Sequence, residues 1–469
     1  MSGALAVFDF GKTNTKLFVF AQDGTLLDER RSAPAWTDFR GRAVLDDAAL
    51  LVWLKEQLAC VVSQHDVANV MVSAHGCTFA LTRGGELLHP ILDYEQEVPE
   101  TVSAEIDPKL PAFSESFTPW LPLGFSIARH MYWLQMDEPD IFAQTDAVLC
   151  FPQYWIWRLT GRTLAECSYL GAHSQLWAPL ERDYSSLVDR LGWRALFPEI
   201  VPAGAVVGKT AVTLKDGSTR ELDVHNGVHD SNAALSYYRM TGLEHFTLVS
   251  TGTWVIIINL DCPLDALDGE RDMIANVTVK GEPAPSLRFM GGREYDRISG
   301  QWNKPIAQAT VERVIERGVF ALPSWAAGGP FPENEGHVLG GEVEGEERAA
   351  VAALYVVMMT DLSLDLIRSQ NLLVVDGGLA RIDLFNGMLA QLRPRQTVVR
   401  SAMAEGSATG AAALAFDALG LAPFRDETVP VRPSAVKGLE AYRDRWRELA
   451  EQARDDARAN RMMPGKGER

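Results

Sequence analysis

Asp9 stands where a carboxylate could do chemistry. It ends an apolar, strand-like run and precedes a small polar turn of glycine, lysine, threonine and asparagine. Such a turn points several backbone N–H groups at one place, which suits phosphate oxygens, and its lysines add positive charge. A carboxylate at the end of the strand can hold a hydrated Mg²⁺, because this ion keeps several waters and needs few protein ligands. A hairpin with an ordinary aspartate in its turn is the alternative.

Asp230 is the second candidate for chemistry. It follows the segment Gly227–His229 and precedes the small apolar run Ala233–Leu235, so we expect it near the start of a helix. A carboxylate there can take the proton of a substrate hydroxyl during phosphoryl transfer, as the catalytic-loop aspartate does in protein kinases. An N-cap is the alternative, because aspartate is common at that position for capping alone. We interpret His229 as a polar support, with a packed core histidine as the alternative.

Two further segments only partly match a P-loop. Gly11–Thr13 and Gly208–Thr210 resemble the Gly-Lys-Thr end of that motif. A P-loop also needs another glycine five positions before the glycine of Gly-Lys-Thr, and Ala6 and Ala203 stand at those positions. No G-x-G-x-x-G pattern follows a strand-like run. The sequence therefore argues against Walker A and Rossmann sites and favours hairpin turns as the phosphate-binding elements.

The hairpin around Asp9 recurs in the second half of the chain. A strand-like run, a small turn and a return strand occupy 5–20, and the same succession occupies 246–260. Gly11 and Gly252 lie 241 positions apart, about half the chain. One hairpin used twice predicts two similar domains, with coincidence as the alternative because strand–turn–strand units are common.

Helical and strand-like patterns alternate along the rest of the chain, which predicts an α/β fold. The spacing of apolar residues predicts helices over 46–63, 154–159, 346–369 and 381–392, and strands over 70–73 and 372–375. The polar, glycine-broken stretch 288–296 is expected to be a charged surface turn, with a loop that reaches a ligand as the alternative. The stretch 439–458 has mixed charges and few apolar positions, so we expect a solvated helix.

Composition and charge bound the class of protein. The chain has 469 residues, enough for two or three domains, of which 47% are hydrophobic and 23% charged. Its net charge of −18 disfavours nucleic acid and anionic membrane surfaces as partners. No apolar run reaches the roughly 20 residues that span a bilayer, and the N-terminus does not resemble a signal peptide. Five scattered cysteines indicate reduced thiols, so we expect a cytoplasmic protein.

Together these segments resemble the FGGY carbohydrate kinases, within the actin-like and sugar-kinase superfamily of ATPases. The resemblance covers nearly the whole chain and rests on motifs in the family's order. In chain order they are Asp9–Lys16, Ser73–Gly76, Ile91–Glu95, Arg158–Gly161, Gly227–Asp230, Ser250–Trp254, Asp376–Gly378 with Asn386, and Gly406–Ala413. Each segment alone is a weak signal, but their order and spacing together are specific.

The resemblance implies two RNase H-like, actin-like ATPase domains with a cleft between them, at 1–241 (sugar side) and 242–469 (nucleotide side). It implies ATP-dependent phosphorylation of a small sugar, with Mg²⁺, Asp230 as general base and Asp9 at the metal. The implied sugar-binding residues are His75, Gly76, Glu95, Gln153, His173 and His229. The implied nucleotide-binding residues are Gly11, Lys12, Thr13, Asn14, Lys16, Thr251, Gly252, Thr253, Gly377, Gly378 and Asn386. A homodimer is the default assembly, because twofold assemblies are common.

The chain departs from the family on the sugar side. Asp93–Glu95 stands where the family often has Trp-Asn-Asp or Tyr-Arg-Asp, and Gln153 stands where many members have aspartate. The His229–Asp230 pair and the turn 250–254 are most similar to rhamnulokinase and fuculokinase members, which favours a 6-deoxyketohexose or a pentulose. The alternatives are a xylulose, ribulose, polyol or glycerol kinase, a catalytically silent sugar-binding regulator, and an actin- or chaperone-type ATPase.

Overall fold

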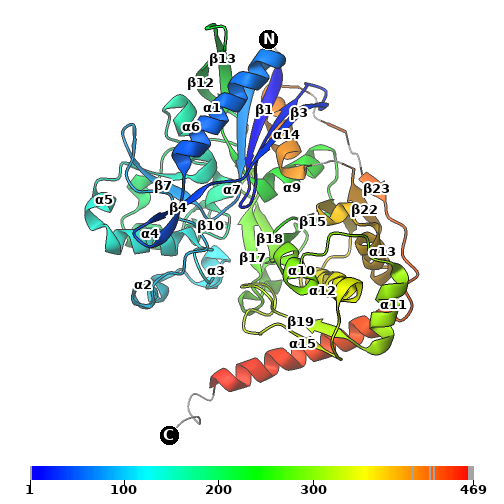
Figure 1. The fold of residues 1–469 in the computed structure, drawn as a ribbon. Helices are drawn as coiled ribbons and strands as arrows, with labels where there is room; N and C mark the ends of the chain where they lie inside the picture. The colour runs from blue at the N-terminus through cyan, green and yellow to red at the C-terminus, as the bar shows by residue number, and fades with distance from the viewer. Residues whose placement is uncertain (1–2, 403–404, 422–423, 426–427, 463–469) are drawn as a thin grey trace. The chain divides into compact units, whose positions relative to one another are not determined.

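The computed structural model describes residues 3–402, 405–421, 424–425 and 428–462, with side chains up to residue 459 (Figure 1). The chain divides into two compact units. The first comprises Met1–Glu244, Ala275–Ala284 and Glu405–Asp426, and the second comprises His245–Ile274, Pro285–Ala404 and Glu427–Arg469. The first unit therefore includes segments from the second half of the sequence, and the division of the chain after residue 241 stays a prediction.

A mixed sheet forms the centre of the first unit. The strands of this unit are β1 (Ala4–Phe10), β2 (Thr15–Phe20), β3 (Leu26–Ser32), β4 (Trp36–Phe39), β5 (Arg42–Leu45), β6 (Val67–Ala74), β7 (Phe79–Arg83), β8 (Glu86–Leu87), β9 (Ala147–Cys150), β10 (Trp177–Ala178), β11 (Asp183–Tyr184), β12 (Val206–Thr213), β13 (Thr219–His225) and β14 (Val228–His229). The main sheet has the order β12-β13-β6-β1-β2-β3, and β14 pairs with β6. β1 is antiparallel to β2, whereas β1, β6 and β14 run parallel. The carboxyl ends of these three strands therefore lie at one edge of the sheet.

The helices of the first unit are α1 (Asp47–Gln64), α2 (Glu100–Ile106), α3 (Phe113–Ser116), α4 (Ile127–Asp137), α5 (Pro139–Ala143), α6 (Phe151–Thr160), α7 (Cys167–Leu170), α8 (Ser186–Arg190), α9 (Asp230–Met240) and α14 (Gly406–Ala418).

Strand β1 is buried on both faces. Because side chains alternate along a strand, Ala6, Phe8 and Phe10 join one core with residues of α1, while Leu5 and Val7 join another with residues of α14. Two cores thus fix the position of the strand that ends beside Asp9.

Small residues allow helices α9 and α14 to pack closely (Figure 1, green and orange). Ala408, Ala411 and Ala412 of α14 are buried in the core that it shares with β1. At Gly410 a Cβ atom would overlap the backbone carbonyl oxygen of Ala233 on α9. Glycine is required there because the two backbones approach too closely for any side chain.

The second unit repeats the strand pairing of the first. Its strands are β15 (Phe246–Thr251), β16 (Val255–Asn259), β18 (Pro283–Phe289), β19 (Phe320–Leu322), β20 (His337–Leu339), β21 (Leu372–Gly377), β22 (Val398–Ser401) and β23 (Thr428–Pro430), and its main sheet has the order β18-β16-β15-β21-β22-β23. The strand β17 (Ile274–Val277) belongs to the first unit from Ala275 on. β15 is antiparallel to β16 and parallel to β21, as β1 is to β2 and β6. The two repeats carry a carboxylate and a hydroxyl on opposite strands of the same parallel pair. In the first unit Asp9 of β1 lies level with Ser73 of β6, whereas in the second Ser250 of β15 lies level with Asp376 of β21.

The helices of the second unit are α10 (Gly291–Ser299), α11 (Gln308–Arg317), α12 (Gly345–Leu366), α13 (Asp383–Leu392) and α15 (Leu439–Met462).

The segment 288–296 is not a surface turn. The segment spans the end of β18 and the start of α10, and Glu294 within it is buried. Oε1 of Glu294 accepts hydrogen bonds from the Tyr355 hydroxyl at 2.8 Å and from the backbone N–H of Trp325 at 2.9 Å. These hydrogen bonds give the buried carboxyl group of Glu294 partners within the unit, which explains why a polar segment can be buried.

Helix α15 is not solvated on all sides, contrary to expectation. Leu439, Tyr442, Trp446 and Ala450 are buried, and their spacing of three to four residues places them on one face. The Tyr442 hydroxyl and the Trp446 indole N–H donate to the backbone carbonyls of Val319 and Ala321, both at 2.7 Å. The charged residues occupy the other faces, which is why composition alone indicated solvation.

Helix α12 is long and apolar enough to cross a membrane by length and composition alone, so the expectation that no segment reaches that length is wrong on this measure. Its apolar window has a mean hydropathy of 1.6 and is 89% buried inside the structure. Such burial is typical of a core helix, which is hydrophobic all round.

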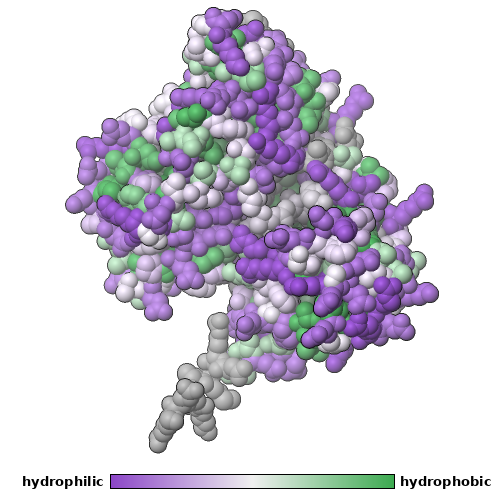
Figure 2. All heavy atoms as spheres, in the orientation of Figure 1, coloured by the Kyte–Doolittle hydropathy of each residue, from purple (hydrophilic) through white to green (hydrophobic). Residues whose placement is uncertain are grey.

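The face drawn in Figure 2 is mostly hydrophilic, with hydrophobic residues in separate small patches.

Candidate active site

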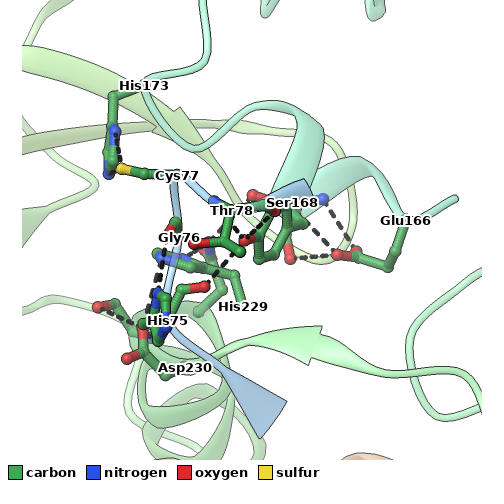
Figure 3. A network of polar contacts seen from close by, with 12 residues as sticks. His75, Gly76, Cys77, Thr78, Glu166, Ser168, His173, His229 and Asp230 are labelled. Atoms are coloured by element: carbon green, nitrogen blue, oxygen red, sulfur yellow. Dashed lines mark hydrogen bonds and ion pairs between the residues drawn. The ribbon is translucent and has the colours of Figure 1, made fainter. Parts of the chain in front are cut away.

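The parallel strand ends bring several of the predicted site residues together. Asp9 on β1 pairs with Ser73 on β6, and Ser73 pairs with Val228 on β14. His75 follows β6 directly, and Asp230 follows β14 as the first residue of α9. Figure 3 shows the β6 and β14 side of this site. We call the group the carboxylate edge; its members are Asp9, His75, Gly76, His229 and Asp230.

Asp9 is 9% exposed at the end of β1. Burial and the negative charge of Asp230 raise the pKa of its carboxyl to about 7, while Lys16, level with it on β2, opposes the rise. The Nζ of Lys16 lies 2.6 Å from Oε2 of Glu405, so its charge is shared between two carboxylates. A bound cation would therefore be favourable beside Asp9.

Asp230 presents a partly exposed carboxylate, with 29% of its side chain accessible. Its Oδ1 accepts hydrogen bonds from the Ser231 N–H at 2.6 Å and the Ser231 hydroxyl at 3.2 Å, and lies 3.3 Å from Nε2 of His229. The predicted helix start is confirmed. The N-cap alternative is wrong, because His229 holds that position and Asp230 is already helical.

His75 presents a neutral ring to the carboxylate edge. Burial lowers its pKa to about 4, although the Gly76 carbonyl, 2.9 Å from Nδ1, and the charge of Asp230 act in the other direction. The ring packs against Tyr94 and Phe151, with centroids 5.2 and 5.0 Å away. Because a carbonyl oxygen can only accept, the hydrogen of the neutral ring is on Nδ1, and His75 can offer the lone pair of Nε2 to a ligand.

Lys12 contacts the segment predicted to bind sugar. Its Nζ forms an ion pair with Asp93 and lies 4.2 Å from the ring centroid of Trp36 and 4.8 Å from that of Tyr94. Oδ1 of Asp93 also accepts a hydrogen bond from the Glu95 N–H at 2.9 Å. The lysine thus fixes the predicted phosphate turn against the predicted sugar segment.

The rest of that turn is compact and exposed at its tip. The Gly11 N–H donates to the Asn14 carbonyl at 2.9 Å, which closes the turn. Thr13 and Asn14 are exposed, and the Asn14 amide donates to the Thr13 hydroxyl at 3.2 Å. These residues can turn toward an anion without leaving buried polar groups unpaired.

Gln153 and His173 lie behind the carboxylate edge and are buried. The amide nitrogen of Gln153 donates to Oδ1 of Asn226 and to the Gly227 carbonyl, both at 3.1 Å. Gln153 therefore holds the segment that leads into β14. Nδ1 of His173 lies 3.4 Å from Sγ of Cys77 (Figure 3).

A polar network behind Asp230 was missed by the sequence analysis. Glu166 accepts hydrogen bonds from the Ser168 N–H at 2.9 Å, the Ser168 hydroxyl at 2.6 Å and the Tyr169 N–H at 3.0 Å (Figure 3). The Asn232 amide nitrogen lies 3.4 Å from the Ser168 carbonyl oxygen and 3.1 Å from Nδ1 of His229. The i, i+3 spacing of His229 and Asn232 near an expected helix start is the one signal that could have revealed this contact.

In the second unit, Thr251 fixes the glycine turn after β21. Its hydroxyl donates to the Asp376 carbonyl at 2.6 Å and accepts from the Leu379 N–H at 2.9 Å, and its own carbonyl accepts from Gly378 N–H at 2.9 Å. Gly377 has a φ of +82°, and a Cβ there would overlap the Thr251 carbonyl oxygen. Only glycine fits, so this turn brings bare backbone to the end of the sheet.

Asn386 and Gly252 complete the predicted nucleotide residues of this unit. Asn386 is buried, and its amide nitrogen donates to the carbonyls of Leu379, Ala380 and Ile382 at 2.8–3.1 Å, so it braces the loop after the glycine turn. The Gly252 N–H donates to the Trp254 carbonyl at 2.8 Å and closes the turn around Thr253.

Comparisons with known proteins agree with the fold and the motif order. Residues 4–236 match the N-terminal domain of the FGGY family of carbohydrate kinases, and residues 243–423 match the carbohydrate kinase FGGY C-terminal domain. A search of curated proteins finds no match.

Solved structures extend the likeness to nearly the whole chain. The chain is 35% identical to a carbohydrate kinase from Novosphingobium aromaticivorans, covering 96% of this chain and 99% of that one with a TM-score of 0.83. A ligand-bound xylulose kinase from Lactobacillus acidophilus (14% identity, 97% and 98% coverage, TM-score 0.80) and a gluconate kinase from the same organism (14%, 97% and 98%, 0.78) share the fold. The chain therefore belongs to the FGGY family of carbohydrate kinases, two-domain α/β enzymes that transfer a phosphoryl group from ATP to an alcohol group.

Proposed function

We propose that this kinase phosphorylates a hydroxyl of a small neutral ketose, such as a 6-deoxyketohexose or a pentulose, with Mg²⁺ and with Asp230 as the general base. The position of Asp230 carries the proposal, because its partly exposed carboxylate stands at the parallel strand ends that also carry Asp9. Phosphoryl transfer needs alignment of the acceptor and charge neutralisation more than covalent help. A carboxylate at this point can accept the proton that the hydroxyl loses.

Asp9 is the residue that we assign to Mg²⁺. Within the described part of the chain, no group of three or more His, Cys, Asp or Glu side chains could hold a metal ion directly. Mg²⁺ does not need one, since it keeps several waters and binds through one or two carboxylates and the substrate phosphates. The raised pKa of Asp9 fits this role, because a nearby cation relieves its unfavourable ionisation. When bound, the ion neutralises charge on the transferred phosphate.

The remaining assignments follow the two turns and the sugar motif. We assign the phosphates to the turns 11–14 and 251–253 with Lys16, and the adenosine to the glycine turn 377–378 braced by Asn386. We assign the sugar to His75, Gly76 and Glu95, with Gln153, His173 and His229 as buried supports. Lys12 pairs with Asp93, which supports a sugar-side role for it over the phosphate role that its motif predicts.

The charges near the carboxylate edge favour a neutral sugar over a sugar acid. Lys12 is paired with Asp93, and Lys16 with Glu405. His75 is neutral above pH 5 because its pKa is about 4. A sugar carboxylate would have to compete with the enzyme's own carboxylates for both lysines, whereas hydroxyl groups can use the existing pairs as donors and acceptors.

The test is ADP release from Mg·ATP across a panel of ketoses, aldoses, polyols and sugar acids. We expect one neutral ketose to give a large response that Asp230→Asn lowers by about 10²–10⁴-fold. Asp216→Asn, an exposed turn aspartate, is the matched control and keeps full activity. A response to xylulose or ribulose is the pentulose outcome of the proposal and identifies a xylulose or ribulose kinase, whereas a larger response to glycerol or another polyol contradicts a ketose substrate. Sugar binding without turnover would instead identify a catalytically silent regulator.

A further inference from the structure

The two oxygens of the Asp230 carboxylate have different surroundings. Among the residues that the structure describes, its hydrogen bonds and ion-pair contacts all fall on Oδ1, from Ser231 and from Nε2 of His229. Oδ2 is left with its lone pairs available. If Asp230 is the base, Oδ2 is the atom that takes the proton, while Oδ1 keeps the carboxylate oriented.

The contact between Nε2 of His229 and Oδ1 of Asp230 is attractive only if Nε2 carries a hydrogen. A neutral imidazole carries one hydrogen, on either Nδ1 or Nε2, and the partner of the other nitrogen decides which. With the hydrogen on Nε2, the positive N–H group lies 3.3 Å (nitrogen to oxygen) from Oδ1 and attracts the carboxylate. With the hydrogen on Nδ1, a lone pair would face the carboxylate and repel it.

Asn232 decides between these forms. Its amide orientation follows from the Ser168 carbonyl oxygen, which can only accept, so the group facing it at 3.4 Å must be the amide NH₂. The same NH₂ nitrogen lies 3.1 Å from Nδ1 of His229, so Nδ1 must accept and the hydrogen must sit on Nε2. Asn232 is 2% exposed and His229 is 4% exposed, so water does not compete for these groups.

The Ser168 carbonyl is itself held in place. Glu166 binds both the N–H and the hydroxyl of Ser168 and the N–H of Tyr169, which fixes the first turn of α7 (Figure 3). A continuous series of contacts therefore leads from Glu166 through Ser168 and Asn232 to His229 and then to Asp230.

We propose that Asn232 is a positioning residue that holds His229 in its Nε2–H form, so that His229 orients Oδ1 of Asp230 and Oδ2 receives the sugar proton. This inference rests on the proposed role of Asp230. In the step, the sugar O–H bond breaks and its proton moves to Oδ2. The oxygen's electron pair forms the new P–O bond as the bond between the γ-phosphorus and the bridging oxygen breaks, and ADP leaves with that bond's electrons.

The test combines NMR of the imidazole nitrogens with kinetics. In protein labelled with ¹⁵N-histidine, the His229 signals are those lost in His229→Gln, among nine histidines. We expect wild type to show the Nε2–H form. In Asn232→Asp at pH 8 a carboxylate replaces the donor, so the hydrogen should move to Nδ1. We expect kcat to fall about 10- to 100-fold, which corresponds to one or two hydrogen bonds, with the ATP KM within about threefold.

A second background separates this role from a structural one. Leucine at position 229 has no hydrogen or lone pair to offer Asp230, whatever residue stands at 232. In His229→Leu, adding Asn232→Asp should therefore lower kcat by less than about threefold. An equal loss in both backgrounds would make Asn232 merely structural. If Asn232→Asp does not fold, Asn232→Leu, which is similar in size and lacks the donor, should show a mixture of tautomers and a lower kcat.

The outcomes also separate this inference from the proposed function. A wild-type spectrum with the hydrogen on Nδ1 overturns the role of Asn232 whatever the variants do. An inactive Asp230→Asn together with an unaffected Asn232→Asp overturns the role of Asn232 and leaves the base intact. A fully active Asp230→Asn would instead overturn Asp230 as the base.

Discussion

Lys12 and Asp93 form an ion pair across 81 positions of the sequence. The ammonium group also lies over the rings of Trp36 and Tyr94, so one side chain joins the first phosphate motif to the sugar motif. Both partners are largely buried, with side-chain exposures of 11% and 13%. A buried pair leaves an unpaired charge when one partner is removed, so its loss has a larger effect than that of a surface pair.

Lys12→Met should therefore weaken sugar binding more than ATP binding. Without the ammonium group, Asp93 loses its partner and the segment that carries Glu95 is free to shift. We expect the sugar KM to rise about tenfold or more, with the ATP KM within about threefold. Lys55→Met, on an exposed position of α1, is the matched control. A rise in the ATP KM alone would return Lys12 to the phosphate role that its motif predicts.

Asp9→Asn should change how stability depends on pH. The unfolded carboxyl loses its proton near pH 3.8, whereas the folded one keeps it to about pH 7. Between these values the folded state binds the extra proton, so the wild-type free energy of unfolding falls as pH rises. Asparagine has no such proton. From pH 4 to 8 the variant should gain roughly 2–4 kcal/mol relative to wild type in urea unfolding. Parallel pH profiles would contradict the raised pKa.

His130→Gln should have the opposite sign. Burial lowers the pKa of His130 from 6.5 to about 4, and Nε2 lies 3.0 Å from the Gln96 carbonyl oxygen. As pH falls from 6.5 to 4 the unfolded state takes up a proton that the folded state does not, so wild type loses stability. The variant should avoid about 1–3 kcal/mol of that loss. His245→Gln, at a side chain 73% exposed, should behave as wild type. Identical acid unfolding of His130→Gln and wild type would reject this explanation.

Gly410→Ala should destabilise the first unit. The new methyl group would overlap the Ala233 carbonyl and force α14 away from α9, the helix that begins at Asp230. We expect a loss of about 1–3 kcal/mol, measured by thermal or urea unfolding. Gly85→Ala is the matched control, because a Cβ there meets nothing within 4 Å. An unchanged Tm for Gly410→Ala would show that the two helices adjust without cost.

Local patterns predicted much of the fold and the placement of Asp230 at a helix start. Both hairpins, the helix over 46–63 and the strand over 372–375 are visible in the spacing of apolar residues, because each depends only on neighbours in sequence. The pairing of Lys12 with Asp93 and the contact of Asn232 with Ser168 could not be predicted in this way. They depend on which strands and helices become neighbours, and the register that brings Asp9 level with Ser73 exists only in the assembled sheet.

Buried charge accounts for the largest error in the second unit. Glu294 looks like a surface residue in sequence, yet its hydrogen bonds to Tyr355 and Trp325 offset the cost of burial. In α15 the relevant signal was present, since Leu439, Tyr442, Trp446 and Ala450 follow a helical period. It was outweighed by the many charges between them, which occupy the solvent-facing sides.

The exchange of Asp9 and Ser73 for Ser250 and Asp376 separates backbone symmetry from chemical symmetry. Each sheet places one carboxylate and one hydroxyl side by side, but on opposite members of the same strand pair. The two hairpins thus have the same backbone pairing but present different side chains at the strand ends. A chimera that copied 5–20 into the place of 246–260 would keep the ladder of backbone hydrogen bonds and set two carboxylates next to each other, which like charges oppose. Likeness between the two halves can therefore persist in the topology while the residues at the strand ends differ in their chemistry.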